Sequence, residues 1–326
     1  MPSVGQGSRA RVGAKLLLFT LSCLVTLLIA EAVLRAFYRS ELAEPTDVRN
    51  LGYRYDKELG WFPLANNRQF FKASRTITAA HNSEGFRGPE LARSNKPRLL
   101  CLGDSLVWGY DVEASERFTE KLQAKHPEWA VYNLGVAGYG TDQEYLLLQK
   151  YFAEYRPHAV FLVICGDNDN DDNASNFRYG YYKPFFTFES GALKLHGVPV
   201  PRSQRVFFSQ HKWLCRPYLV RLIVAAFFKL TSPPLFKNPD PPTGVLLLEL
   251  QKYIVSRGAW FGVGLQHSHA ELEKFLSRYK IPYVDLQTTN PAHFYVAFGN
   301  HWTPQGHAFV AEKIDQFFKS RPDQRH

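Results

Sequence analysis

The stretch KPRLLCLGDSLVWG, residues 96–109, predicts a buried strand that turns at once into a helix. Its apolar run Leu99–Leu102 is bounded by a proline and by Gly103, which is typical of a strand inside a parallel sheet. The residues from Ser105 to about Ala124 have the spacing of a helix. A serine at this junction presents its hydroxyl to solvent beside the unpaired amides of the first helical turn, so Ser105 is a candidate nucleophile.

Taken alone, Ser105 is equally well explained as a helix cap, since Asp and Ser are favoured at that position. A serine hydroxyl becomes a nucleophile only with a base in hydrogen-bond reach and with donors aimed at the developing oxyanion. Three downstream segments, in a fixed order, supply groups of these kinds, and together they favour the catalytic interpretation.

The first of these segments is the glycine-rich loop NLGVAGYG, residues 133–140, between a short strand at Ala130–Tyr132 and a helix that begins near Thr141. Its glycines lack the spacing of a dinucleotide-binding fingerprint, and no acidic residue follows at the expected distance, so phosphate binding is not predicted. The loop instead offers a backbone amide without a side chain in the way, at the tip of a strand expected to neighbour the first.

The second segment, HAVFLVICGDNDNDDN at 158–173, is an apolar strand that ends in a polar cluster. Alternate aspartates from Asp167 onward mimic the opening of a calcium loop, but the required glycine and closing glutamate are absent, so no metal site is predicted. We expect Asn168 or its neighbours to form the polar lip of a cleft, because ligands bind at strand tips in open parallel sheets.

The third segment, FGNHWTPQGHAFVAEKI at 298–314, places His301 in a loop before a helix that opens near Thr303. Two other histidines, His267 and His269, face a predicted loop and are expected to be solvated.

Composition limits the classes of function. The 326 residues are 45% hydrophobic, enough for one sizeable core, and the formal net charge is +9. The Lys and Arg residues are spread thinly without interleaved aromatics or zinc-finger spacing, so nucleic-acid binding is not predicted. A basic chain is equally consistent with attraction to anionic lipid headgroups. The four cysteines form no CxxC pair, and a disulfide framework is not expected.

The N-terminus has a basic tail, residues 1–15, followed by an apolar segment at 16–38. Two interpretations remain for this segment: a transmembrane anchor, or a cleavable signal whose Ala30-Glu31-Ala32 has the form of a cleavage site. The anchor is favoured because the apolar run continues through that point to an interfacial Phe and Tyr. A short basic N-terminus that stays in the cytoplasm would place the rest of the chain outside.

Residues 39–95 are predicted to be a stalk and a lead-in of short strands, in which HNSEGFRGPE at 81–90 packs beside the central strand without chemistry of its own. Residues 96–326 form the main domain, interrupted by an insertion at 174–242. Within the insertion, the sequence predicts a β-hairpin at Tyr182–Leu195 with its turn at Ser190-Gly191, and an apolar helix at Trp213–Leu230. The insertion is interpreted as a lid, as a segment against the membrane surface, or as a helix packed on the side of the domain.

Strands and helices alternate again after the insertion, which predicts an α/β fold with a parallel sheet of about five strands. With its four segments in order, the sequence resembles the SGNH subgroup of GDSL hydrolases, in particular membrane-anchored bacterial members. The resemblance covers about 82–318, excepting much of the insertion. It implies a three-layer α/β/α flavodoxin-like domain behind an N-terminal transmembrane helix.

The same resemblance implies a role for one residue in each segment. Ser105 of GDSLVWG corresponds to the nucleophile, with its own amide in the oxyanion hole. The Gly138 amide of NLGVAG and the Asn168 side-chain amide of GDND correspond to the second and third donors. His301 of HWTPQGH corresponds to the general base.

The sequence departs from the family pattern just before His301. An aspartate two or three residues earlier orients the histidine in the family, whereas Phe298 and Gly299 stand there in this chain. Removing the corresponding charge in a serine protease triad costs about 10⁴ in turnover. A Ser-His dyad held by a backbone carbonyl, a contribution from Asp285, and a weak or inactive site are the alternatives.

The resulting hypothesis is a membrane-anchored extracytoplasmic serine esterase that needs no cofactor and acts on an O-acyl ester of a glycan, a lipid or a small molecule. An O-acyltransferase acting on a glycan and an inactive binding or scaffold protein are the competing interpretations.

Overall fold

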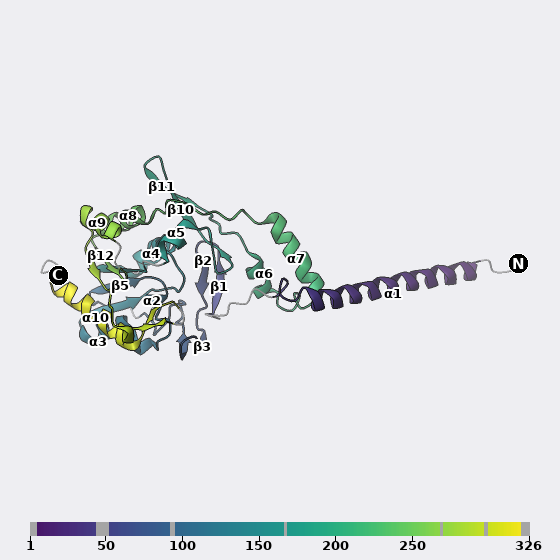
Figure 1. Ribbon diagram of the computed structural model, residues 1–326, viewed down its shortest axis with the longest axis horizontal. Coiled ribbons are helices and arrows are strands. Elements are labelled where there is room, and N and C mark those ends of the chain that lie inside the picture. The colour runs from purple at the N-terminus through teal and green to yellow at the C-terminus, as the bar shows by residue number, and fades with distance from the viewer. Residues whose placement is uncertain are drawn as a thin grey trace. The chain divides into compact units, whose positions relative to one another are not determined.

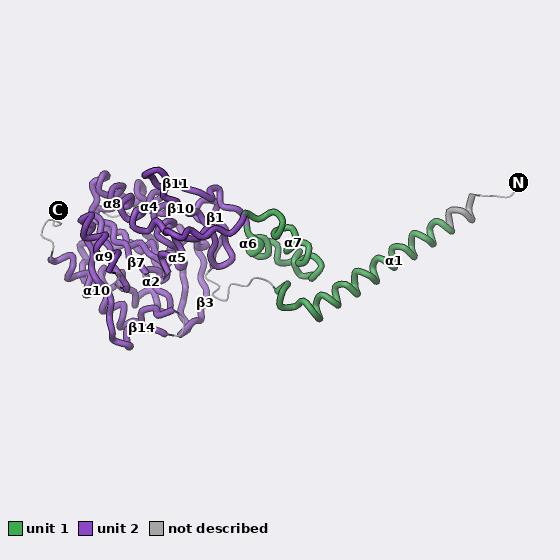
Figure 2. The backbone as a smooth tube through the Cα atoms, turned by 45° about the horizontal axis from the view of Figure 1, so that its top comes forward, with its two compact units in different colours: residues 1–46, 203–233 green, residues 47–202, 234–326 purple. Residues whose placement is uncertain are grey.

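The computed structural model describes residues 5–43, 52–91, 95–165, 168–267, 270–296 and 299–320, and side chains from residue 11 onward. The chain forms two compact units (Figure 2). Unit 1 comprises residues 1–46 and 203–233, and unit 2, which contains the central sheet, comprises 47–202 and 234–326. The two units are described separately.

A five-stranded parallel sheet in the order β13-β12-β7-β5-β6 forms the centre of unit 2 (Figure 1). Its strands are β5 (Arg98–Leu102), β6 (Ala130–Asn133), β7 (Ala159–Ile164), β12 (Trp260–Leu265) and β13 (Tyr283–Asp285). The central strands are buried along almost their whole length, as their uninterrupted apolar sequences require. The predicted α/β class with five parallel strands is confirmed.

Helices cover both faces of this sheet. On one face, α3 (Phe118–Lys125) and α10 (Pro304–Lys319) pack on Leu99, Cys101, Phe161 and Val163. The intervening residues point to the other face, where α4 (Thr141–Tyr155) lies against β5 and α8 (Thr243–Val255), with α9 (Ala270–Arg278) beside α8. This arrangement is the three-layer sandwich that the sequence predicts.

The helix after β5 differs from the prediction. Instead of running from Ser105 to Ala124, α2 (Ser105–Trp108) is four residues long and is followed by the 3-10 turn η1 (Ala114–Glu116) and by α3. Gly109 ends α2 with φ +84°, and a Cβ atom there would lie 2.4 Å from Cδ of Arg117. The break follows from this left-handed residue, which glycine adopts without strain.

Hairpins precede and follow the first part of the sheet. Before it, β1 (Tyr53–Asp56) pairs with β2 (Gly60–Pro63), and β3 (Arg68–Lys72) pairs with β4 (Thr76–Ala80). In the predicted insertion, β10 (Phe185–Glu189) pairs with β11 (Ala192–His196), as expected for a turn at Ser-Gly. The remaining short elements of unit 2 are α5 (Asp169–Ala174), β8 (Phe177–Arg178), β9 (Tyr181–Tyr182), η2 (Pro291–His293), β14 (Phe294–Tyr295) and β15 (His301–Trp302).

Unit 1 consists of the long helix α1 (Gly5–Phe37) with α6 (Gln204–Gln210) and α7 (Tyr218–Thr231). Within α1, Arg11–Phe37 is long and apolar enough to cross a membrane, with a mean hydropathy of 2.4 and no buried part. An N-terminal signal sequence meets the same criterion, so the helix is a membrane anchor or a signal by length and composition.

Candidate active site

Ser105 and His301, 196 positions apart in the chain, meet beyond the carboxyl end of β5. Nε2 of His301 lies 2.8 Å from Oγ of Ser105. Ser105 is the first residue of α2, and His301 lies in β15, just before α10. Both residues are almost buried, with 8% and 9% of their surface exposed. The serine hydroxyl therefore faces the imidazole and is not open to solvent, in contrast to the sequence prediction.

The turn into α2 is built by Gly103 and Asp104. A Cβ atom on Gly103 would lie 2.3 Å from Cγ2 of Val107, so only glycine fits between the strand and the helix. Asp104 caps the helix, because its Oδ1 accepts the N–H of Leu106 at 2.9 Å. Its Oδ2 lies 3.3 Å from Oγ of Ser105, which places the hydroxyl between a carboxyl and an imidazole.

An aromatic ring holds the imidazole. The Tyr110 ring stacks on His301 with the ring centres 4.2 Å apart and the planes inclined by 22°. The preceding backbone passes close to the ring, since a Cβ atom on Gly299 would lie 3.6 Å from Cε1 of His301. Of the two positions at which the resembled family carries an aspartate, Gly299 has no side chain and Phe298 lies outside the described residues. Asp285 ends β13, and its Oδ1 accepts the N–H of Gln287.

The two further sequence-predicted residues lie in loops beside this turn. The loop after β6 is tied to it, because the N–H of Val136 donates to the carbonyl of Gly103 at 3.1 Å. Gly138 follows with φ +88°, and a Cβ atom there would lie 2.5 Å from the Tyr179 ring. The Asn168 side chain reaches Asp104, with Nδ2 3.3 Å from Oδ2.

The structure brings together Ser105, His301 and Asn168 through Asp104, and places Gly138 in the adjoining loop. Two residues of the GDND segment, 166 and 167, lie outside the described part of the chain.

Sequence reasoning missed a group of buried carboxyls near Ser105. They are Asp104, Asp142, Glu144, Asp169 and Asp172, each with 1% or less of its surface exposed. Burial raises the pKa of Glu144 well above its ordinary value, and the neighbouring carboxylates raise it further. Burial acts on the pKa of Asp169 in the same way, and the nearby Asp104 adds to it. One sequence signal could have indicated this group: acidic residues occupy the first turns of α4 and α5, the helices that follow the tips of β6 and β7.

Two cations balance part of this group. The buried Lys183 forms an ion pair with Asp142, and its Nζ also donates to the carbonyl of Asp172 at 2.9 Å. Nε of Arg178 lies 2.9 Å from Oδ1 of Asp172. Burial nevertheless raises the pKa of Asp172 to about 7, although both cations act to lower it. Among the described residues, no set of His, Cys, Asp and Glu has the arrangement of a metal site.

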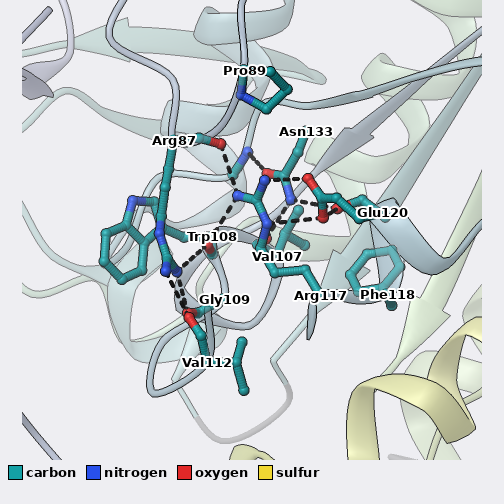
Figure 3. A network of polar contacts seen from close by, with 12 residues as sticks. Arg87, Pro89, Val107, Trp108, Gly109, Val112, Arg117, Phe118, Glu120 and Asn133 are labelled. Carbon is teal, nitrogen blue, oxygen red and sulfur yellow. Dashed lines mark hydrogen bonds and ion pairs between the residues drawn. The ribbon is translucent and has the colours of Figure 1, made fainter. Parts of the chain in front are cut away.

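Two buried arginines hold the far end of α2 (Figure 3). Arg87 donates to the carbonyls of Trp108 at 3.2 Å and Val112 at 2.6 Å, and also bonds the carbonyl of Gly109. Arg117 donates to the carbonyls of Arg87 at 2.8 Å and Trp108 at 3.3 Å. Burial, together with the charge of Arg117, lowers the pKa of Arg87 to about 9.

A third side chain completes this support. Nδ2 of Asn133 donates to the carbonyl of Val107 at 2.7 Å (Figure 3). Arg87 comes from the segment 81–90, in which the sequence indicated no chemistry; its hydrogen bonds hold the end of α2, the helix that begins with Ser105.

Comparison with known proteins gives a consistent but distant picture. No family model matches the sequence, and no curated protein sequence matches it. The solved structures that it resembles include a member of the lipolytic G-D-S-L family from Veillonella parvula, at 15% identity and a TM-score of 0.40 over 69% of this chain and 99% of that one. A lipase/acylhydrolase from Enterococcus faecalis is 14% identical, with a TM-score of 0.40 over 69% of this chain and 96% of that one. A GDSL-like lipase from Bacteroides thetaiotaomicron is 12% identical, with a TM-score of 0.35 over 71% and 93%.

Proposed function

We propose that the chain is a serine esterase of the SGNH/GDSL type, in which Ser105 is the nucleophile and His301 the general base. The observation that carries this proposal is the 2.8 Å contact between Nε2 and Oγ, made at the tip of a central strand by two almost buried side chains. A hydroxyl in this position loses its proton to the imidazole as it attacks, which is the activation that serine requires.

In the proposed reaction, Oγ of Ser105 bonds to the ester carbonyl carbon while its proton passes to Nε2 of His301. The imidazolium then gives that proton to the departing alcohol oxygen, and the acyl group remains on Ser105. A water molecule, deprotonated by the same imidazole, releases the acid and restores the hydroxyl. The face of Tyr110, 4.2 Å from the imidazole ring, favours the transient positive charge.

Three donors are proposed to stabilise the oxyanion: the amides of Ser105 and Gly138 and the side-chain amide of Asn168. The Ser105 amide is the first amide of α2, among the N–H groups that have no intrahelical acceptor and that favour negative charge nearby. The Asn168 amide has two long contacts, to Asp104 at 3.3 Å and to Asp172 at 3.4 Å, and long hydrogen bonds of this kind are exchanged for one to a substrate at modest cost. Each such donor contributes about 3–4 kcal/mol to catalysis in a well-studied protease.

The low exposure of Ser105 and His301 favours a small acyl group, such as an acetyl ester on a glycan or a lipid. We further propose that α1 stays in the membrane as a single-pass anchor with unit 2 outside the cytoplasm. The length and high mean hydropathy of Arg11–Phe37 support the anchor, and the basic residues at the start of α1 support the orientation.

The test uses the full chain in detergent with a fluorophosphonate probe and with p-nitrophenyl acetate as substrate. Ser105→Ala and His301→Gln are expected to lose labelling and at least about 10³-fold in kcat, whereas the exposed Ser115→Ala keeps both. If wild type fails to label, or if Ser105→Ala retains its activity, the proposal is wrong. Release of free acetate, as opposed to transfer to an added glycan, identifies the acceptor as water.

A further inference from the structure

Glu31 is an acidic residue inside the apolar helix α1, and the structure gives it a partner far along the chain. Its two carboxylate oxygens accept the N–H groups of Tyr218 and Leu219, each at 2.9 Å, and these are the first two residues of α7. Arg35, one turn further on, donates to Glu31 at 2.7 Å. Glu31 therefore caps α7, which joins that helix to α1 at a defined level.

That level lies near the edge of a bilayer. At about 1.5 Å per residue, Glu31 lies about 22 Å along the helix from Leu16, where the apolar segment begins, and the hydrocarbon core of a membrane is about 30 Å thick. The apolar stretch continues to Phe37, about 9 Å further. Because α7 starts at Glu31, within about 9 Å of the end of the apolar stretch, it begins near the boundary between acyl chains and headgroups.

The two faces of α7 have different surroundings. One face packs inside unit 1, where Val224 joins Phe208 and Cys215 in a small buried cluster. The opposite face is apolar and largely exposed, with 67% of Ile223, 58% of Phe227 and 84% of Leu230 accessible. With Leu219, Leu222 and Ala226 these residues follow the spacing of one helix face; we name this set the apolar stripe. Such a stripe on a short surface helix needs a covering partner.

The charge around the stripe indicates which partner covers it. Residues 203–233 contain no Asp or Glu and five basic residues: Arg205, Lys212, Arg216, Arg221 and Lys229. Trp213, which is 77% exposed, precedes the helix. Basic residues, an interfacial aromatic and an apolar stripe together fit the surface of a membrane that contains anionic lipids.

We infer that α7 is an interfacial helix that lies in the plane of the membrane, with its apolar stripe in the acyl boundary of an anionic bilayer. This inference rests on the proposed anchoring by α1 and is independent of the proposed esterase chemistry. The bilayer is preferred over a second copy of the chain because the stripe begins near the level where α1 leaves the hydrocarbon, and because the surrounding cations repel another copy of the same segment.

The test uses the full chain in nanodiscs of phosphatidylcholine and phosphatidylglycerol. A spin label is placed on Cys23, which is exposed in mid-span, in a Cys165→Ser background. Separate labels are placed by Ile223→Cys, Phe227→Cys and Phe70→Cys in a background that also carries Cys23→Ser. Phe70 is the control, because it is 81% exposed and lies in unit 2.

Labels in the bilayer collide more with oxygen than with a water-soluble nickel chelate. We expect more collisions with oxygen than with the nickel chelate for the labels at positions 23, 223 and 227, and more collisions with the nickel chelate for the label at position 70. Glu31→Gln, which loses the charge of the cap, should increase label mobility at 227 while the Cys23 label stays at depth.

If the labels at 223 and 227 behave like the one at 70 while Cys23 is in the bilayer, the inference is wrong and the anchor stands. Dipolar broadening at 227 that appears only with two chains per nanodisc identifies a second copy as the partner and also overturns the inference. If Cys23 itself is in water, both the anchor and the inference fail, whereas labelling of Ser105 by the fluorophosphonate is unaffected.

Discussion

Replacing Asp172 with Asn should reduce the pH dependence of stability, because this carboxyl binds a proton more tightly in the folded chain than in the unfolded chain. Its side chain is 1% exposed, and its charge interacts favourably with Arg178 and Lys183 and unfavourably with Asp104 and Asp142. Burial is the largest effect and raises the pKa from 3.8 to about 7.

The sign follows from proton linkage. Between pH 4 and pH 7 the folded chain holds this proton and the unfolded chain does not, so the free energy of unfolding falls as the pH rises. A difference of about three pKa units corresponds to about 4 kcal/mol in total, of which about 3 kcal/mol is lost between pH 5 and pH 8. The contribution is fully present below pH 4 and is lost as the pH passes 7.

The assay is thermal unfolding of the full chain in detergent, followed by tryptophan fluorescence at several pH values. From pH 5 to pH 8, the melting temperature of wild type should fall by about 6–12 °C more than that of Asp172→Asn. Because each protein is compared with itself at two pH values, any pH-independent change in melting temperature caused by losing the contact with Arg178 cancels. Asp171→Asn is the matched control, since that residue lies on the same helix with a side chain 66% exposed, and it should follow wild type.

Parallel melting curves for wild type and Asp172→Asn across this range would show that the carboxyl is ionised in the folded state at pH 5. The inference that burial keeps the Asp172 carboxyl protonated in the folded chain at pH 5 would then be wrong. If the melting temperature of Asp171→Asn depends on pH as weakly as that of Asp172→Asn, the loss of negative charge in general, and not the buried carboxyl, explains the difference from wild type.

Three other substitutions test the surroundings of the nucleophile. Tyr110→Leu removes a ring stack worth about 0.5–1.5 kcal/mol and should lower kcat about 2- to 12-fold with little change in KM; an unchanged kcat would exclude a positioning role. Gly138→Ala places a methyl group 2.5 Å from the Tyr179 ring, on a backbone with φ +88°. We expect the backbone strain to lower the free energy of unfolding by about 1–2 kcal/mol and the activity to fall. A stable, fully active variant would contradict this expectation. Arg87→Met deprives the carbonyls of Gly109 and Val112 of a charged donor. The free energy of unfolding, measured by denaturant unfolding, should fall by about 2 kcal/mol, because removing a buried charge offsets part of the loss of the hydrogen bonds. An increase in stability would count against the proposed support of α2.

The central sheet could be predicted from sequence because its strands carry their own signal. Arg98–Leu102 and Ala159–Ile164 are short apolar runs bounded by breakers, and burial on both faces allows no polar interruption. The strand tips then predicted Ser105, Asn168 and the loop with Gly138 as candidates, because a parallel sheet brings its carboxyl ends to one edge.

The parts that sequence did not reveal depend on contacts between distant positions. Helical spacing continues past Gly109, so only the left-handed backbone and the Arg117 side chain against it show where α2 ends. Glu31 looked like an interruption of the apolar run or part of a cleavage site, and its partner lies 187 positions away. The burial of the acidic residues was not predicted, since nothing local distinguishes a capped surface carboxyl from one under a neighbouring loop.

The shortness of α2 explains why so many distant residues serve one serine. A helix of four residues makes too few backbone hydrogen bonds to hold itself in place. Asp104 fixes its start, and Asn133, Arg87 and Arg117 hold the carbonyls at its end. Since Arg87 follows the β3–β4 hairpin, the residues that precede the sheet are part of the structure that aims Oγ at His301 and are not a passive stalk. The geometry of the serine-histidine pair is therefore a property of the whole of unit 2, and substitutions far from Ser105 in sequence should change kcat through α2 without touching a substrate.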